Sequence, residues 1–185
     1  MTDHALDTVL PAAVLGQPWA LRRLYDELAP PVNGYLRSRG ASAPEDLTSE
    51  VFLVVFTRLP EVTGGMAGLR TFVFSVAHAR LVDDLRRRSR QPETVEFDPG
   101  RYERRATSAS AEDQALASMS DESVRAVLGR LPEDQRDVLL MRLVGDLTVD
   151  EVAAVMGRSS GAVKQLQRRA VVALREHFST SGVPL

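Results

Sequence analysis

The chain has 185 residues, room for one medium domain or two small ones, and its 44% apolar and 26% charged residues are ordinary for a globular protein. The sequence contains no cysteine, which excludes disulfides, thiolate metal sites and cysteine nucleophiles. The net charge of −2 conceals an asymmetry, because residues 113–157 carry a net −5 and residues 158–185 a net +4. Such local asymmetry says more about binding partners than the total charge does.

No segment of the sequence indicates a membrane protein. The N-terminal stretch MTDHALDTVL lacks the basic start and apolar run of a signal peptide, and the apolar run at 51–56 is far too short to cross a bilayer. We therefore expect a cytoplasmic protein without membrane insertion.

Apolar residues recur at helical spacing through most of the chain and no stretch alternates as a strand would, so the sequence predicts an all-α fold. The first helices are expected at 2–15 and from Pro18 onward, and the Pro30-Pro31 pair should kink or split the second. Ser42 and Glu45 form a capping-box pattern that predicts the start of a third helix, which runs to about residue 59.

The rest of the chain divides into a loop, a helix, a linker and a second helical region. The glycines of 60–68 predict a loop, and a fourth helix should cover 69–88. Without apolar periodicity, residues 91–111 read as a flexible linker between a domain at 1–90 and a domain at 112–179, with a tail at 180–185. Helices of the second domain are expected at 112–130, 133–144, 148–156 and 160–178.

The most specific local signal is a helix-turn-helix pattern in the second domain. Thr148 and Glu151 form a capping box, Gly157 can end a helix in the left-handed conformation, and Ser159 or Ser160 can cap the next helix. An apolar stripe follows on that helix, made of Val163, Leu166, Ala170 and Leu174. A short helix, a glycine turn and an amphipathic second helix are typical of a DNA-reading unit.

The opposite face of the second helix carries amide and cationic side chains suited to DNA. Ser160, Lys164 and Arg168 fall on one stripe, and Gln165 and Arg169 lie beside it. Arginine and lysine suit guanine edges and phosphates, and glutamine suits adenine. The alternative is that two ordinary bundle helices present a solvated basic face to water.

Four segments, taken in order, resemble the extracytoplasmic-function (ECF) RNA polymerase sigma factors. The sequence EDLTSEVF at 45–52 and the segment 72–88, which ends in DDLRRR, resemble sigma region two. The segment LPEDQR at 131–136 resembles the opening of region four, and TVDEVA at 148–153 with GAVK at 161–164 resembles its helix-turn-helix. The resemblance covers roughly residues 18–90 and 112–177.

The resemblance implies a role for each domain and a set of partners. In relatives the acidic helix of region two docks on core polymerase, and Asp46 and Glu50 share one helix face as such docking needs. The Pro60–Arg70 loop and the following helix would recognise and melt the promoter −10 element, and the helix-turn-helix would bind the −35 element. The residues expected at the −10 element are Arg70, His78, Arg80, Arg86, Arg87 and Arg88. The arginine run also suits a solvated helix C-terminus, and the two roles are compatible.

Two positions depart from the family pattern. Phe72 stands where relatives have tryptophan, a tolerable aromatic substitution in a core, and Ala79 stands where relatives have an asparagine near the −10 strand. Ala79 therefore removes a polar side chain that relatives use near the −10 strand, and the resemblance leaves open how this chain reads the −10 bases. Because His78 has no evident acid partner, an exposed or interface position suits it better than a catalytic one.

The sequence thus predicts a sigma factor that binds core RNA polymerase and promoter DNA. The family also implies an anti-sigma partner. The alternative is a helix-turn-helix regulator with an unrelated N-terminal sensor or dimerisation domain. An enzyme has little support, since the sequence lacks a glycine-rich phosphate loop, a nucleophile elbow and a metal-ligand cluster, and no cofactor is expected.

Overall fold

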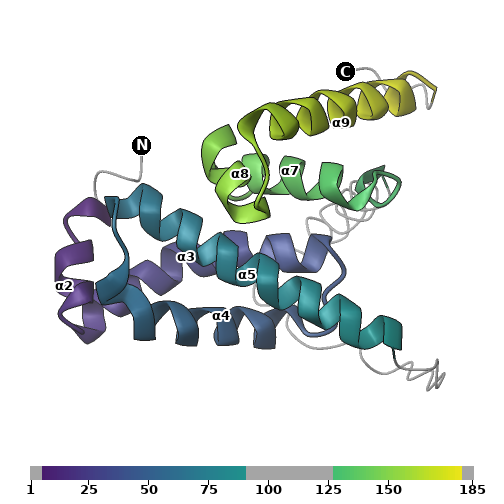
Figure 1. Ribbon diagram of the computed structural model, residues 1–185. Helices are drawn as coiled ribbons and strands as arrows, with labels where there is room; N and C mark the ends of the chain where they lie inside the picture. Colours follow the sequence, from purple (N-terminus) through teal and green to yellow (C-terminus); the bar gives the residue numbers. More distant parts are fainter. Residues whose placement is uncertain (1–5, 91–126, 181–185) are drawn as a thin grey trace, which may run out of the picture.

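The computed structural model describes residues 6–90 and 127–180, and within these ranges the chain is all-α, as predicted. Figure 1 shows two helical groups, one stacked on the other. The elements of the N-terminal group are α2 (Leu10–Val14), α3 (Pro18–Ser38), α4 (Pro44–Arg58), the short 3₁₀ helix η1 (Leu59–Glu61) and α5 (Gly65–Arg90). The elements of the C-terminal group are α7 (Glu133–Leu143), α8 (Val149–Met156) and α9 (Ser160–Thr180). The predicted linker at 91–111 and most of the predicted helix at 112–130 lie outside the described residues.

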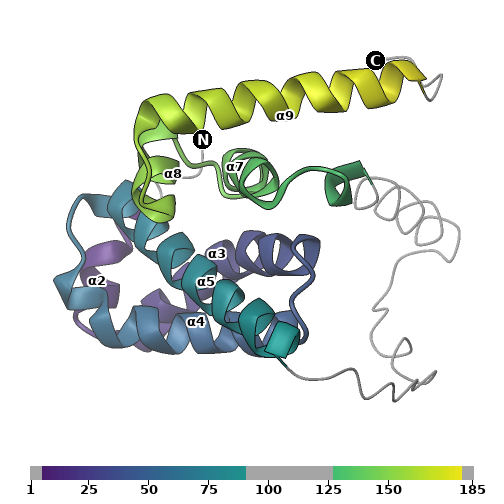
Figure 2. The same cartoon turned by 45° about the vertical axis from the view of Figure 1, so that its right-hand side comes forward.

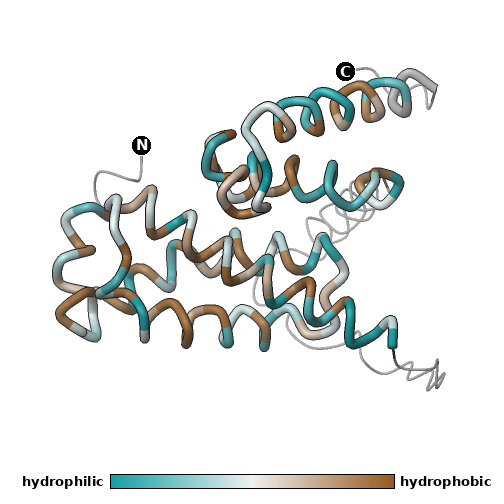
Figure 3. The backbone as a smooth tube through the Cα atoms, in the orientation of Figure 1, coloured by the Kyte–Doolittle hydropathy of each residue, from teal (hydrophilic) through white to brown (hydrophobic). Residues whose placement is uncertain are grey.

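The N-terminal group is built on α3, α4 and α5, and α2 packs against α3 near the start of the chain. Tyr35 stacks edge-on against Phe74 of α5 with ring centroids 5.8 Å apart, and Tyr25 meets Phe52 of α4 in the same way at 4.9 Å. Such edge-to-face pairs stabilise a core beyond the burial of their area. The tube in Figure 3 shows apolar and polar stretches alternating along the turns of α9, as an amphipathic helix requires.

The second helix is not split at Pro30 and Pro31, because both lie inside the single helix α3. Each proline removes one backbone N–H from the helical hydrogen bonds. Flanking residues Leu28, Val32 and Tyr35 are nearly fully buried. Their tertiary packing keeps the helix continuous where local preference would interrupt it.

The predicted capping box at Ser42 is also wrong. The residue at the N-cap of α4 is Ala43, and no side chain caps this end. Instead, Ser42 donates from its backbone N–H and its hydroxyl to the carboxylate of Asp84 on α5, at 3.0 and 2.7 Å. The Ser42 side chain, which the local pattern assigned to the start of the helix, is therefore hydrogen-bonded to Asp84, 42 residues away in the sequence. The next helix, α5, begins at Gly65 and not at 69, so the loop before it is shorter than predicted.

The C-terminal group contains the predicted helix-turn-helix. Both hydrogen bonds of the Thr148–Glu151 capping box are present at the start of α8, and Gly157 ends α8 in the left-handed conformation with φ 61°. Ser159 accepts a hydrogen bond from the Ala162 N–H and so caps α9. The turn that orients α9 against α8 is therefore set by residues within 15 positions of one another, which explains why sequence alone predicts it.

The two groups pack on each other through one continuous hydrophobic cluster. Residues of the C-terminal group such as Met141, Leu147 and Val152 belong to the same buried cluster as Phe74 of α5. In Figures 1 and 2 the C-terminal group lies over α3 and α5, with α9 farthest from the N-terminal group. This packing leaves the outer face of α9 uncovered by the described N-terminal residues.

Candidate nucleic-acid interface

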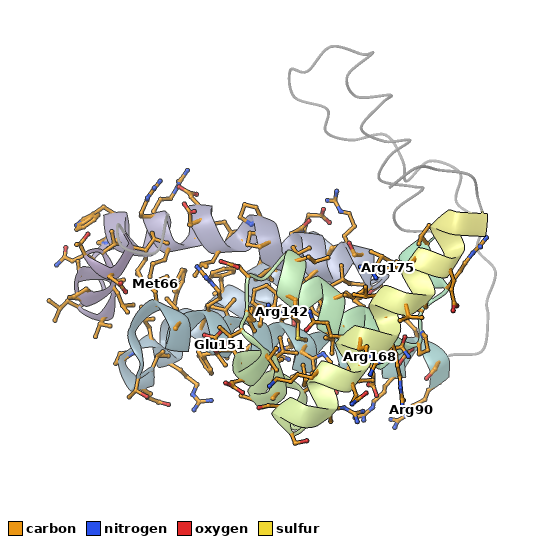
Figure 4. The ribbon with its side chains drawn as sticks, turned by 90° about the horizontal axis from the view of Figure 1, so that it is seen from above. Met66, Arg90, Arg142, Glu151, Arg168 and Arg175 are labelled. Atoms are coloured by element: carbon orange, nitrogen blue, oxygen red, sulfur yellow. The ribbon has the colours of Figure 1, made fainter. Side chains whose placement is uncertain are left out.

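The outer face of α9 presents the amide and cationic side chains expected from the sequence. Lys164, Gln165, Arg168 and Arg169 are exposed, whereas Val163 and Ala170 on the opposite face are fully buried. Figure 4 shows Arg168 and Arg175 one behind the other along the same helix. A helix fixed on one side by core packing and lined by donors on the other can enter a DNA major groove and hydrogen-bond base edges and phosphates.

Ser160 occupies a different position from the other predicted members of this face. It is only half-exposed, and its hydroxyl donates to the carboxylate of Asp150 on α8. Ser160 therefore links α9 to α8, the two helices of the motif, through this hydrogen bond. Arg158 of the turn similarly pairs with Asp134 of α7, which ties the turn to a third helix.

A hollow beside η1 and the start of α5 is the second feature with the shape of a ligand site. Its volume is about 420 Å³, and its lining comprises Arg58, Glu61, Val62, Thr63, Gly68, Thr71, Phe72 and Ser75. The Arg58 guanidinium lies over the Phe72 ring, 5.4 Å from its centroid, as in a cation–π contact. A planar base could stack on this aromatic ring while the surrounding hydroxyls and charged groups contact its edge.

Phe72 is thus a lining residue of this hollow and is only half-buried, which corrects its prediction as a core side chain. Sequence reasoning also missed Arg58, since the residue lies at the end of α4, before the predicted loop. The backbone here is tight: a Cβ added to Gly68 would lie 1.8 Å from the Thr63 carbonyl oxygen. Glycine at 68 is therefore what allows the loop to close on the start of α5.

The six residues predicted for the −10 element fall into two groups along α5. Arg86, Arg87 and Arg88 are exposed at the end of the helix, and Arg80 is half-exposed one to two turns before them. Arg80, Arg86, Arg87 and Arg90 line one polar hollow of about 370 Å³ together with Asp83. Such a cluster of guanidinium groups suits the phosphates of a nucleic-acid strand.

The other two residues, Arg70 and His78, face the C-terminal group. The Arg70 guanidinium lies 3.5 Å from Asp146, and its side chain is only 15% exposed. His78 is half-buried, with its Nδ1 2.9 Å from the hydroxyl of Tyr35. His78 also interacts electrostatically with Asp137 and Asp134 of α7, so it lies where the two helical groups meet.

The predicted docking residues Asp46 and Glu50 are both exposed on α4. Leu53, one turn further on, is 70% exposed, so an uncovered apolar side chain follows two acids along the helix. The sequence analysis did not include Leu53. The signal that could have found it is its position three residues after Glu50, which places an apolar side chain on the same helix face as the two acids. Glu50 also lies 4.0 Å from Arg80 of α5, a solvent-exposed pair of little energetic weight.

A buried polar cluster joins α3 to α7. Arg39 donates from Nε to Asp137 Oδ1 at 2.6 Å, and the Tyr35 hydroxyl donates to the same oxygen at 2.9 Å. Burial, followed by the adjacent Asp137 carboxylate, raises the pKa of Tyr35 well above its usual value, so the hydroxyl keeps its proton. Because that proton goes to Asp137, His78 must donate from Nδ1 to the Tyr35 oxygen. Burial lowers the pKa of His78.

The described residues contain no group of three or more histidine, cysteine, aspartate or glutamate side chains placed to hold a metal ion. Likewise, none of the helices that the structure describes is long and apolar enough to cross a membrane.

Known proteins match the C-terminal domain alone in one comparison and nearly the whole chain in another. The family described as Sigma-70, region 4, matches residues 127–176, the segment that contains α7, α8 and α9. The ECF RNA polymerase sigma factor SigD of Mycobacterium tuberculosis (strain ATCC 25618 / H37Rv) is 31% identical over an alignment of 190 positions. The alignment covers 98% of this chain and 88% of SigD. The ECF RNA polymerase sigma factor ShbA of Streptomyces griseus is 32% identical over 171 residues, covering 88% of this chain and 90% of ShbA.

The fold also has a solved counterpart. The structure of CnrH in complex with the cytosolic domain of CnrY matches 94% of this chain and 97% of that chain, with a TM-score of 0.66 and 20% sequence identity. The relatives match across both domains, which does not favour a helix-turn-helix regulator with an unrelated N-terminal domain. This chain belongs to the ECF RNA polymerase sigma factors, which are transcription initiation factors.

Proposed function

We propose that the three exposed surfaces described above divide the work of promoter-specific initiation. The acidic face of α4, with Asp46, Glu50 and Leu53, docks on core RNA polymerase. The hollow beside Phe72 and the arginines at the end of α5 bind the −10 element as it melts. The exposed face of α9 binds the −35 element, and this face is the observation that carries the proposal.

The division follows from the chemistry of each surface. A duplex major groove calls for a rigid helix with amide and cationic side chains, which α9 presents. A melted strand calls for an aromatic platform and nearby cations, which Phe72 and the α5 arginines supply. A protein surface with acids and an exposed leucine suits a partner with basic and apolar groups.

The chain would act without chemistry of its own, in the cytoplasm where polymerase and chromosome meet. It would position DNA on an enzyme that supplies the catalysis. An anti-sigma protein is a further proposed partner. The support for this partner is that CnrH, whose fold this chain shares, was solved in complex with the cytosolic domain of CnrY.

The test is a footprint of a target promoter with core polymerase, with this protein, and with both together. Because the two DNA-binding surfaces lie on different domains, we expect protection of both promoter elements only when core is present to hold them at a fixed spacing. Strong promoter-specific protection by the protein alone would contradict this division of roles.

A further inference from the structure

The turn between α3 and α4, residues 39–43, is attached to the last turns of α5. Ser42 donates two hydrogen bonds to the carboxylate of Asp84, which is only 5% exposed. Arg88, one turn further along α5, donates from its guanidinium to the carbonyl oxygen of Gly40. In Figures 1 and 2 this turn lies beside the end of α5. We call Gly40, Ser42, Asp84 and Arg88 the turn clamp.

The ionised state of Asp84 strengthens the turn clamp. Burial by itself would raise the pKa of this carboxyl group, but the hydrogen bonds from Ser42 and the charges of Arg88 and Arg87 outweigh burial and lower the pKa. Asp84 is therefore an ionised acceptor at neutral pH. Hydrogen bonds to an ionised group are stronger than those between neutral groups, and a buried carboxylate without its donors is unfavourable.

The turn clamp stabilises an end of α4 that has no local cap. Ala43 is at the N-cap, and no side chain there bonds to the first N–H groups of the helix. An uncapped end frays more easily than a capped one. Its first turn contains Asp46, the first acid of the proposed docking face. By holding Ser42, two residues before the helix begins, Asp84 fixes the backbone that carries this acid.

The arginines at the end of α5 lie on two different faces of the helix. The polar hollow described above is lined by the guanidinium groups of Arg80, Arg86, Arg87 and Arg90. Arg88 follows the buried residues Leu81 and Asp84 at helical spacing, so it lies on the face that packs on the protein. Arg87 connects the two faces, because its Nη2 is 3.8 Å from Asp84 Oδ1 while its side chain is 69% exposed.

We propose that Asp84 and Arg88 are positioning residues that hold the docking helix α4 and the phosphate-binding arginines of α5 in one fixed relation. Asp84 acts through Ser42 on the first turn of α4 and through Arg87 on the polar hollow. Arg88 acts through the α3–α4 turn and does not bind promoter DNA, which separates its role from that of Arg86. The proposal rests on the proposed function, because it names residues that support the docking and −10 surfaces.

The salt dependence of promoter opening separates positioning from phosphate binding. Opening would be followed by permanganate footprinting at several salt concentrations, with core polymerase in saturating excess. Loss of a phosphate contact should make the salt dependence shallower by about one charge, and we expect this for Arg86→Ala. Arg88→Ala should instead reduce opening by roughly tenfold at every salt concentration. Ser89→Ala, which removes a hydroxyl bonded to the Arg86 carbonyl of the same helix, should open the promoter normally.

A double-mutant cycle tests whether Asp84 acts through Arg87. Asp84→Ala should reduce opening by roughly tenfold in the natural sequence and by much less in a chain that already carries Arg87→Ala, because the side chain that Asp84 positions is then absent. Equal reductions in the two backgrounds would indicate a general loss of stability and reject positioning of Arg87. Asp84→Asn keeps an acceptor for the Ser42 N–H and should restore part of the activity.

Affinity for core polymerase reports the effect on the docking helix. Asp84→Ala and Ser42→Ala should each weaken core binding by roughly threefold or more. The double variant should bind no more weakly than Asp84→Ala alone, because both substitutions remove one shared contact. Chemical denaturation checks folding. If Asp84→Ala does not fold, Ser42→Ala decides, since it removes only one of the two hydrogen bonds.

The outcomes that contradict each part of the proposal are distinct. If Arg88→Ala makes the salt dependence shallower to the same extent as Arg86→Ala, Arg88 holds DNA and its assignment is wrong. Normal core affinity and opening in Ser42→Ala and in folded Asp84→Ala would overturn the role of Asp84. If the unsubstituted protein neither binds core nor opens a promoter, the proposed function fails and the proposal fails with it. Normal initiation by that protein together with unaffected variants rejects the turn clamp alone.

Discussion

Lys164, Gln165 and Arg168 are neighbours on the exposed face of α9, yet their chemistry predicts different consequences of substitution. An alanine that removes a base contact should cost about 1–3 kcal/mol of binding and relax preference at one position. An alanine that removes a phosphate contact should weaken all promoters alike and make the salt dependence shallower by about one charge. Gln165→Ala can behave only in the first way, because a neutral amide releases no counterion.

The measurement is transcription from a library of −35 variants at two salt concentrations, and Arg37→Ala serves as a control on an exposed arginine far from α9 in sequence. Unchanged activity and preference in all three α9 variants would show that a different face of the helix meets DNA.

Substitution of Gly68 tests the proposed role of the hollow beside Phe72 in binding the −10 element. A methyl group at 68 would overlap the Thr63 carbonyl oxygen, so Gly68→Ala must displace the loop and change the shape of the hollow. We expect overpacking to destabilise the protein by about 1–3 kcal/mol, seen in chemical denaturation, and −10-dependent melting to fall more than core binding. Gly129→Ala is the control, since a Cβ there meets nothing within 4 Å. Normal melting by Gly68→Ala would contradict the role of the hollow.

At the scale of the helix, α4 carries the docking prediction. Reversing Asp46 and Glu50 to lysine should weaken core binding because it inverts the charge of an exposed face, while helical content stays the same. Affinity for core can be measured by fluorescence anisotropy, with circular dichroism as the check on folding. Asp26→Lys reverses another exposed acid, on α3, and should bind core normally. Equal core affinities for the wild type, the double variant and the Asp26 control would reject α4 as the docking helix.

An element can be predicted from the sequence when the residues that fix it are close together in the chain, and not when they are far apart. The turn between α8 and α9 is specified by Thr148, Gly157 and Ser159, all local, and the structure confirms it. Ser42 fails as a predicted cap because its partner is Asp84 on another helix. The contact of Arg39 with Asp137 joins residues 98 positions apart, and nothing in the local patterns around either residue indicates it. The same holds for the hollow beside Phe72, which depends on how the end of α4 meets α5.

For the whole molecule, His78 predicts that the packing of the two helical groups on each other depends on pH. The titratable or charged groups that face it are Tyr35 of α3, Arg39 directly after α3, and Asp137 and Asp134 of α7. Burial lowers the pKa of His78, so the chain with its two groups packed together binds this proton less readily than a chain in which they are apart. The stabilisation of this packing is therefore complete above the ordinary histidine pKa of about 6.5 and is lost as the pH falls toward the lowered value.

Small-angle scattering at pH 7.5 and at pH 5.5 measures this effect. We expect the radius of gyration of the free protein to rise at the lower pH as the two groups separate, and His78→Gln to remove most of that dependence. A radius that changes equally in the wild type and in His78→Gln would assign the titration to another group.

The central claim is that this chain directs core RNA polymerase to specific promoters, and mapping of transcript starts tests it most directly. Core polymerase would be incubated with genomic DNA from the source organism, with and without this protein, and the 5′ ends of the transcripts sequenced. The account predicts a set of starts that needs both components and shares a −10 and a −35 element, and it predicts that Arg168→Ala depletes these starts. Identical starts with and without the protein would contradict it.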